Sequence, residues 1–313
     1  MDAVNEFIAG SLIDHNYDRE ALAIQITLDK REQTPIYWHD YRHTIAPPRP
    51  RVLAASRAPS HSGLAASLVD FDEEELARQL TLVEFAIFRN IRLAELIKTV
   101  WAKARTNHQS PNVLRLVDRF NQVSQWTIAE IVTTARLDDR VAMMEKLIKV
   151  AHKLLGLQNY NSAMAIVAGL NNAPILRLKH TKARLAPAAV ASLEDAERFF
   201  RNQRNYLTYR AALRAATPPC LPYFGMYLQD LTFVWDGNDT FVDEAGTVVN
   251  FEKCGLTAAV MADLRHFQRV PYNFEPVETI QKMLASFPHF TDEELYGLSL
   301  SREPRGASLK DVM

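Results

Sequence analysis

The sequence has few cysteines and no long apolar run. Only Cys220 and Cys254 occur among its 313 residues, and they do not form a CxxC motif. This scarcity indicates a reducing compartment and argues against a structural zinc site. The N-terminus is acidic, and no apolar stretch reaches the roughly 18 residues that a membrane span needs. We therefore expect no secretory signal and no direct insertion into a membrane.

The chain also lacks an excess of charge of either sign. Lys and Arg number 36 against 37 Asp and Glu, a formal net charge of -1. A balanced chain has no general electrostatic attraction for nucleic acid or anionic lipid. We therefore expect no nucleic-acid partner, and a partner recognised through a local surface. The length is sufficient for one large domain or two ordinary ones.

Motifs of covalent and cofactor chemistry are missing as well. The ten glycines form neither GxGxxG nor GxxxxGK[ST], and HExxH and GxSxG are absent. Of the nine scattered histidines, His39 and His43 lie four apart, but two ligands do not close a metal site. Asp138 is better interpreted as a helix N-cap, with Asp139 near the positive end of the helix dipole. We expect no cofactor and no metal; the alternative is an all-α metal-dependent enzyme.

What the chain does contain is helical periodicity. Asp72 and Glu75 predict a capped helix start, Ser110 and Pro111 predict an N-cap with a first-turn proline, and Pro187 opens a further helical stretch. Alternating strand patterns are nearly absent, and no repeat of about 30 to 50 residues is visible. The residues therefore predict an all-α fold, an orthogonal helical bundle.

Several short blocks resemble a known family, in the family's order. PYFGMYLQDLT at 222–232, followed by VNFEK at 249–253, resembles the third conserved block of the Cdc25-homology domain, the exchange-factor domain for Ras-family GTPases, and the hairpin after it. The other similar blocks are ARQLTLVEF at 77–85, RFNQVSQW at 119–126, YNSAM at 160–164 with APILRL at 173–178, and SREPR at 301–305. The resemblance covers about residues 70–305 and implies the same all-α orthogonal bundle with a protruding helical hairpin.

The sequence predicts that residues 251–287 form two helices joined by a tight turn. The first should end near Gln268 because Pro271 forbids its continuation, and the second should start at Glu275. One face of the first helix shares the side chains of Leu256, Ala259, Val260, Asp263 and Phe267. Pattern alone is equally compatible with burial of this stripe in the core.

The resemblance assigns roles to these residues. The family's hairpin is wedged beside the GTPase nucleotide site, where Ala259 and Val260 would disturb the magnesium position and Asp263 would supply a carboxylate that competes with phosphate. Asn250 and Phe251 would pin the hairpin base to the bundle. The resemblance implies GTPase contacts on the second and third blocks and the first hairpin helix; the candidates are Arg140, Arg177, Asn205, Tyr206 and Phe267. Gly255 departs from the basic residues of many relatives and weakens the helix start.

The resemblance implies a guanine nucleotide exchange factor that opens the site of a Ras-superfamily GTPase of Ras, Rap or Ral type and catalyses no covalent chemistry. By thermodynamic linkage, the nucleotide-free GTPase must be bound most tightly. The alternative is a catalytically silent scaffold with the same fold. We expect a cytoplasmic protein, recruited to membranes through its lipidated GTPase or through missing domains.

The chain divides, on these grounds, into four parts. Residues 1–43 are interpreted as a short helical segment, with a fragment of a Ras-exchanger-motif-like region as one interpretation, and residues 44–69 as a Pro/Ser-rich linker. Residues 70–308 are assigned to the exchange domain, and 309–313 to a tail.

Overall fold

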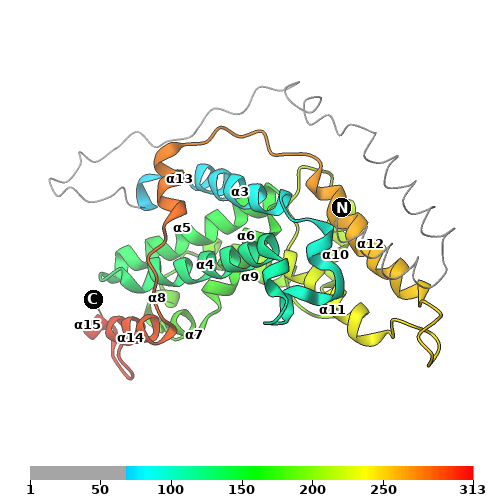
Figure 1. Cartoon of the computed structure of the whole chain (residues 1–313). Helices are drawn as coiled ribbons and strands as arrows, with labels where there is room; N and C mark the ends of the chain where they lie inside the picture. Colours follow the sequence, from blue (N-terminus) through cyan, green and yellow to red (C-terminus); the bar gives the residue numbers. More distant parts are fainter. Residues whose placement is uncertain (1–67, 313) are drawn as a thin grey trace. The chain divides into compact units, whose positions relative to one another are not determined.

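The computed structural model describes residues 68–312, and this part of the chain is all-α, as predicted (Figure 1). It contains no β-strand in that range, only the isolated bridges Asn159–Leu221 and Phe241–Val249. The segments predicted for residues 1–43 and most of 44–69, with His39 and His43, lie outside the described residues. No helix within 68–312 has the length and apolar character needed to cross a bilayer.

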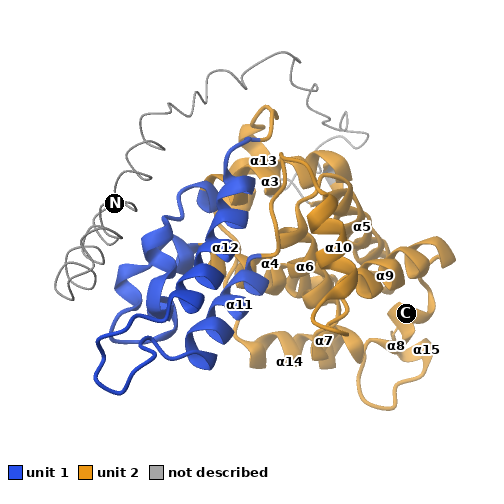
Figure 2. Cartoon of the chain, turned by 90° about the vertical axis from the view of Figure 1, so that its right-hand side faces the viewer, with its two compact units in different colours: residues 1–44, 87–115, 224–271 blue, residues 45–86, 116–223, 272–313 orange. Residues whose placement is uncertain are grey.

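The described residues fall into two compact units, coloured separately in Figure 2. Unit 1 contains residues 87–115 and 224–271; unit 2 contains 68–86, 116–223 and 272–312. The elements, in chain order, are η2 (Leu68–Asp70), α3 (Glu73–Arg89), η3 (Leu93–Ala102), η4 (Asn107–Gln109), α4 (Pro111–Thr133), α5 (Leu137–Gly156), α6 (Tyr160–Leu170), α7 (Ala173–Leu176), α8 (Lys179–Ala183), α9 (Pro187–Phe199), α10 (Leu207–Ala215), α11 (Phe224–Gly237), α12 (Phe251–Gln268), α13 (Glu278–Ala285), α14 (Asp292–Arg302) and α15 (Leu309–Val312).

Unit 2 is built around α5, which packs against α6, α8 and α9. Its side chains Met144, Leu147, Ile148, Ala151 and Leu154 recur at helical spacing and are buried. At the start of α3, the Asp72 carboxylate accepts hydrogen bonds from the backbone N–H of Glu74 and Glu75, so the predicted cap is confirmed.

In unit 1, the start of α4 is capped by a distant carboxylate. Pro111 occupies the first position as predicted, but the Ser110 hydroxyl donates to the Glu95 carbonyl instead of capping the helix. The Glu95 carboxylate accepts the backbone N–H groups of Asn112 and Val113, at 2.8 and 3.2 Å. A buried acid therefore satisfies N–H groups that a helix start leaves without partners.

The predicted hairpin has a different second helix. α12 ends at Gln268, as the position of Pro271 indicated, but α13 begins only at Glu278 and belongs to unit 2. Residues 269–277 between them are not helical, so the predicted tight turn is wrong. α12 instead packs beside α11 within unit 1, and the loop 238–250 connects the two (Figures 1 and 2). We call α11, this loop and α12 the α11–α12 hairpin.

Candidate functional site

Asn250 fixes the start of α12 to the loop before it. Its side-chain oxygen accepts from the backbone N–H of Lys253 at 3.1 Å, and its amide nitrogen donates to the Asp239 carbonyl at 3.0 Å. Its backbone N–H donates to the Thr240 carbonyl. The residue is thus an N-cap that orders the hairpin loop, rather than the predicted pin between hairpin and bundle.

Phe251 does not brace the hairpin. Its side chain is 71% exposed, because it lies in the first turn of α12 on the side opposite to the buried Lys253. The prediction of a ring packed at the hairpin base is therefore wrong. An exposed ring at this position is instead available to a partner.

Lys253 fastens the start of α12 to the end of α11. Its ammonium donates to the carbonyls of Trp235 and Asn238, at 3.1 and 2.7 Å, and lies 4.3 Å from the centre of the Trp235 ring. The side chain is 5% exposed, and this burial lowers the pKa of its ammonium, while the carboxylates of Asp239 and Asp236 raise it. A cation at the last carbonyls of α11 is favourable. The VNFEK block contains this lysine, but spacing alone gave no indication of its partners.

The predicted face of α12 is not core. Leu256 is 44% exposed, Ala259 is exposed and Val260 is partly exposed. The helix instead buries Thr257 and Met261 with their neighbours on the opposite side. An exposed stripe of small and apolar side chains on a packed helix is the kind of surface that protein partners cover.

Phe267 is an exception on this face, and its predicted contact with a GTPase is corrected by its burial. It is 2% exposed. The neighbouring Gln268 is also buried, and its amide donates to the carbonyls of Phe88 and Ile91 at 2.8 and 3.0 Å. The last turn of α12 therefore enters the interior of unit 1, whereas the turns before it keep one face in solvent.

Asp263 is exposed and also has a partner. The hydroxyl of Tyr227, a buried residue of α11, donates to its carboxylate at 2.5 Å. The carboxylate therefore links the two helices. A second exposed carboxylate of the hairpin is Asp236, in the last turn of α11. Among residues 68–312 no hydrogen bond reaches Asp236, so its oxygens face solvent.

Arg140 is a structural residue of unit 2, and its predicted contact with a GTPase is corrected by its burial. The side chain is fully buried, and its guanidinium donates to the carbonyls of Thr134 and Ala135 and to the Thr181 hydroxyl. Glu303 lies 3.9 Å away as its counter-charge. A group enclosed in this way cannot reach a partner without unfolding its surroundings.

Arg177 is likewise occupied inside unit 2. Its guanidinium donates to the carbonyls of Ser299 and Glu303, at 2.6 and 2.5 Å, and lies over the Tyr296 ring. These contacts tie α7 to α14. Arg177 remains partly exposed, so its contact with a GTPase stays a prediction.

Asn205 and Tyr206 lie on an exposed, strained bend before α10. Arg204, Asn205 and Tyr206 all have positive φ, at 49°, 54° and 57°, a backbone conformation that residues other than glycine rarely adopt. Asn205 is exposed, and the Tyr206 ring lies 6.2 Å from the ring of Tyr223, whose pKa burial raises to about 12. The pair stays a candidate contact surface.

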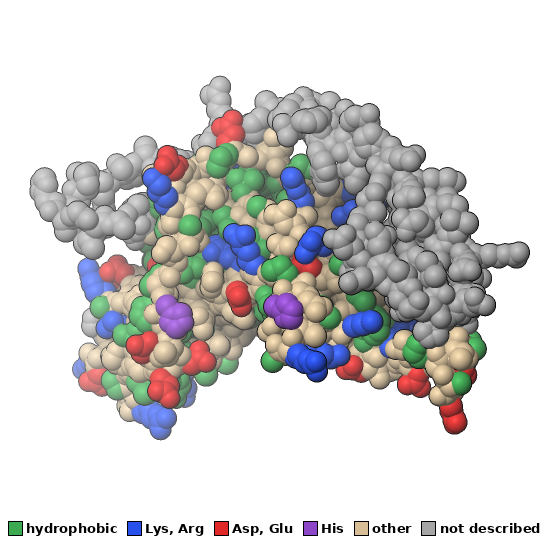
Figure 3. Space-filling view, viewed as in Figure 1, with side chains coloured by type: hydrophobic (Ala, Val, Ile, Leu, Met, Phe, Trp, Pro, Cys, Tyr) green, Lys and Arg blue, Asp and Glu red, His purple; other side chains and the backbone are tan. Residues whose placement is uncertain are grey.

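The described residues hold no group of three potential metal ligands. Asp138 and Asp139 lie in the first turn of α5, but Arg136 occupies the N-cap position, so the predicted cap was misplaced. Asp138 instead pairs with Arg184 at 2.9 Å. Charges of both signs are interspersed over the face of the described residues in Figure 3.

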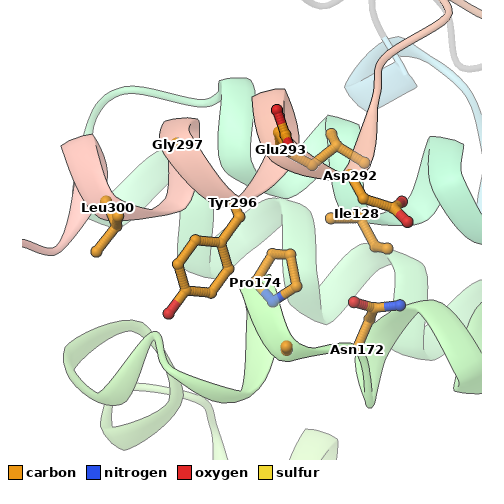
Figure 4. Close-up of a pocket in the computed structure, with 10 residues that line it drawn as sticks. Ile128, Asn172, Pro174, Asp292, Glu293, Tyr296, Gly297 and Leu300 are labelled. Atoms are coloured by element: carbon orange, nitrogen blue, oxygen red, sulfur yellow. The ribbon is translucent and has the colours of Figure 1, made fainter.

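A cavity of about 510 Å³ lies in unit 2 among α4, α7 and α14 (Figure 4). Apolar groups such as Ile128, Pro174 and Leu300 line much of it, with Asn172 and Asp292 among its polar residues. These side chains do not include a nucleophile paired with a general base, so we do not assign chemistry to this cavity.

The all-helical architecture and the exposed hairpin face agree with the class of fold that the sequence blocks indicated. The RasGEF domain model matches residues 75–255. The chain is 37% identical over 313 aligned residues to Ras guanine nucleotide exchange factor A of Dictyostelium discoideum. The alignment covers 96% of this chain and 51% of that protein. Exchange factors I and J of the same organism are 39% and 40% identical, over 86% and 77% of this chain.

The chain therefore belongs to the RasGEF domain family. It spans about half the length of factor A and about a third of factors I and J.

Proposed function

We propose that this chain is a guanine nucleotide exchange factor for a Ras-superfamily GTPase of Ras, Rap or Ral type. One observation carries the proposal: a fastened helical hairpin in a RasGEF-family chain exposes small and apolar side chains where a helix would ordinarily bury them. The reaction involves no covalent step. The chain would accelerate release of GDP, and free GTP would then refill the site.

The mechanism is competitive displacement. A GTPase holds its nucleotide through a phosphate-binding loop, whose N–H groups donate to phosphate oxygens, and through a magnesium ion, which needs oxygen ligands. Insertion of the face formed by Leu256, Ala259 and Val260 would place hydrocarbon near the metal position, where magnesium cannot be coordinated. A carboxylate nearby would take the N–H groups that the phosphate releases.

Two hairpin residues are candidates for that carboxylate. Asp263, which the sequence suggested, already accepts the Tyr227 hydroxyl, so one of its oxygens is partly occupied. Asp236 is exposed and has no hydrogen-bond partner within residues 68–312. A carboxylate that accepts no hydrogen bond in the free protein loses less when it binds a phosphate-loop N–H, which favours Asp236.

Linkage determines the preferred state of the GTPase. If the factor lowers the affinity of the GTPase for nucleotide by a given ratio, nucleotide lowers the affinity of the GTPase for the factor by the same ratio. We therefore propose that the nucleotide-free GTPase is the tightest partner. Phe251 in unit 1 and, separately, Asn205 and Tyr206 in unit 2 are the candidate contacts. Membrane recruitment would follow from the lipid anchor of the GTPase.

The direct test uses GTPases of Ras, Rap and Ral type loaded with a fluorescent GDP analogue. We expect faster release from at least one of them on addition of the chain and excess GDP, and tight binding of the same GTPase without nucleotide. Release at the intrinsic rate throughout would reject exchange activity. Binding without acceleration would identify the alternative, a silent scaffold.

A further inference from the structure

Two polar links join the helices of the hairpin, one at each end. Tyr227 lies in the first turn of α11 and donates to Asp263 in the penultimate turn of α12. Lys253 lies in the first turn of α12 and donates to the carbonyls of Trp235 and Asn238 at the end of α11. The links therefore close both ends of an antiparallel pair.

Both links start from buried side chains. Tyr227 is 2% exposed and Lys253 is 5% exposed, so most of each side chain is withdrawn from water. A buried donor that loses its acceptor is costly, and hydrogen bonds are directional in a way that apolar contact is not. A shift of α12 along α11 by one turn, about 5.4 Å, would break both links at once.

The packing between α11 and α12 needs this directional component. α12 buries a mixed set of side chains against unit 1, including Thr257, Met261 and Leu264, and keeps Leu256 and Ala259 in solvent. Hydrophobic burial is non-directional, so this surface alone would tolerate small shifts in register. The polar links select one register.

We propose that Tyr227 and Lys253 are positioning residues that fix the register of α12 on α11 before the GTPase arrives. This inference rests on the proposed function. In the fixed register, Asp236 and the exposed face of α12 are presented together. A hairpin without the links must be ordered during binding, and that cost is subtracted from the energy available to displace the nucleotide.

The first experiment is a double-mutant cycle on exchange. Tyr227→Phe keeps the ring and removes the donor; Asp263→Ala removes the acceptor; the third variant carries both changes. We expect each single variant to lower the maximal exchange rate at saturating chain about tenfold, equivalent to about 1.4 kcal/mol. The double variant should be no slower than either single variant, because one link is lost in all three.

Lys253 is tested in the same assay with Lys253→Met, which keeps the length of the side chain without its charge or donors. Lys253→Arg should restore part of the rate because a guanidinium also donates to carbonyls. Lys282→Met and Tyr296→Phe, on α13 and α14, are matched controls and should exchange like the parent. Within residues 68–312, the one interaction of the Lys282 ammonium is an exposed ion pair with Glu278.

A separate reading distinguishes failure of this inference from failure of the proposed function. Amide hydrogen exchange of α12 measures the link without any GTPase, and Tyr227→Phe should lower protection there while protection of α5 stays at the parent level. If the parent accelerates release and Tyr227→Phe matches its maximal rate, the positioning role is overturned. If the parent accelerates nothing, the proposed function fails, and unchanged α12 protection in Tyr227→Phe would overturn the link as well. Should Lys253→Met not fold, the Tyr227→Phe result decides.

Discussion

The side-chain amide of Asn161 donates a hydrogen bond to the carboxylate of Glu84, 3.0 Å away and fully enclosed in unit 2. Burial raises the pKa of this carboxyl, although Arg119, Asn161 and Ser162 oppose the shift. The same desolvation lowers the pKa of the Arg119 guanidinium. A buried acid and base thus support each other in the interior of the bundle.

A pH dependence of stability follows from Glu84. Because the folded pKa is raised above the unfolded value, the folded state binds the proton more tightly, so this residue's contribution is present below the unfolded pKa and is lost as pH rises through the folded pKa. Glu84→Gln does not titrate. We expect the stability of the parent relative to Glu84→Gln to fall as pH rises from about 4.5 upward, measured by urea unfolding. A difference that is constant between pH 4.5 and 8 would contradict the raised pKa.

The exposed Phe251 ring gives a second prediction. Since little of the ring is buried, Phe251→Ala should change the free energy of unfolding by no more than about 0.5 kcal/mol. We expect a clear loss of exchange from the missing contact with the GTPase. Thermal unfolding beside the exchange assay separates the two effects. A loss of several kcal/mol would show that the ring is packed in solution.

The two hairpin carboxylates give a third. Asp236→Asn removes the charge of an exposed carboxylate that accepts no hydrogen bond within residues 68–312, and should lower exchange about tenfold or more. Asp263→Asn keeps an oxygen that accepts the Tyr227 hydroxyl, so we expect a smaller effect. Both variants should keep the parent's unfolding midpoint, because both residues are exposed. A larger loss of exchange in Asp263→Asn than in Asp236→Asn would indicate that Asp263 is the carboxylate that competes with phosphate.

Arg140 gives a prediction about stability alone. Arg140→Ala leaves Glu303 buried without its counter-charge, and breaking such a pair typically costs about 3 to 5 kcal/mol. Chemical denaturation should show this loss. Folded Arg140→Ala should exchange nucleotide at the parent rate per folded molecule. Weaker binding of the GTPase by the folded variant would restore Arg140 to the contact surface.

The sequence predicted the helical class and several helix ends because these depend on local signals. Asp72 caps α3 as expected, and Pro187 opens α9, since each acts within one turn of its own helix. The helix that packs beside α12 could not be predicted from local signals. Both α11 and α13 are neighbours of α12 in sequence, and the packing of α12 beside α11 is a tertiary contact.

The site was harder to predict because charge and aromatic character do not reveal burial. The resemblance made Arg140 and Arg177 candidate contacts with a GTPase, but it gave no sign of their internal partners. Arg140 lies beside Glu303, and Arg177 donates to the Ser299 carbonyl, both distant in sequence. Phe251 was expected to pack against the bundle, yet its ring is exposed, while Lys253, to which no role was assigned, is enclosed. Side chains two residues apart on a helix point to nearly opposite sides, so one can face solvent while the other faces the interior.

Lys253 is held at the end of α11 chiefly by the hydrogen bonds that its ammonium donates to main-chain oxygens. Every amino acid supplies a carbonyl, so the side-chain identity of residues 237 and 238 is not fixed by this link. The tip of the hairpin is therefore open to variation: its side chains can diverge among related chains, or be exchanged by an engineer to suit a different GTPase, while the helices beneath keep their alignment. In this arrangement selectivity can evolve at the tip without a new scaffold.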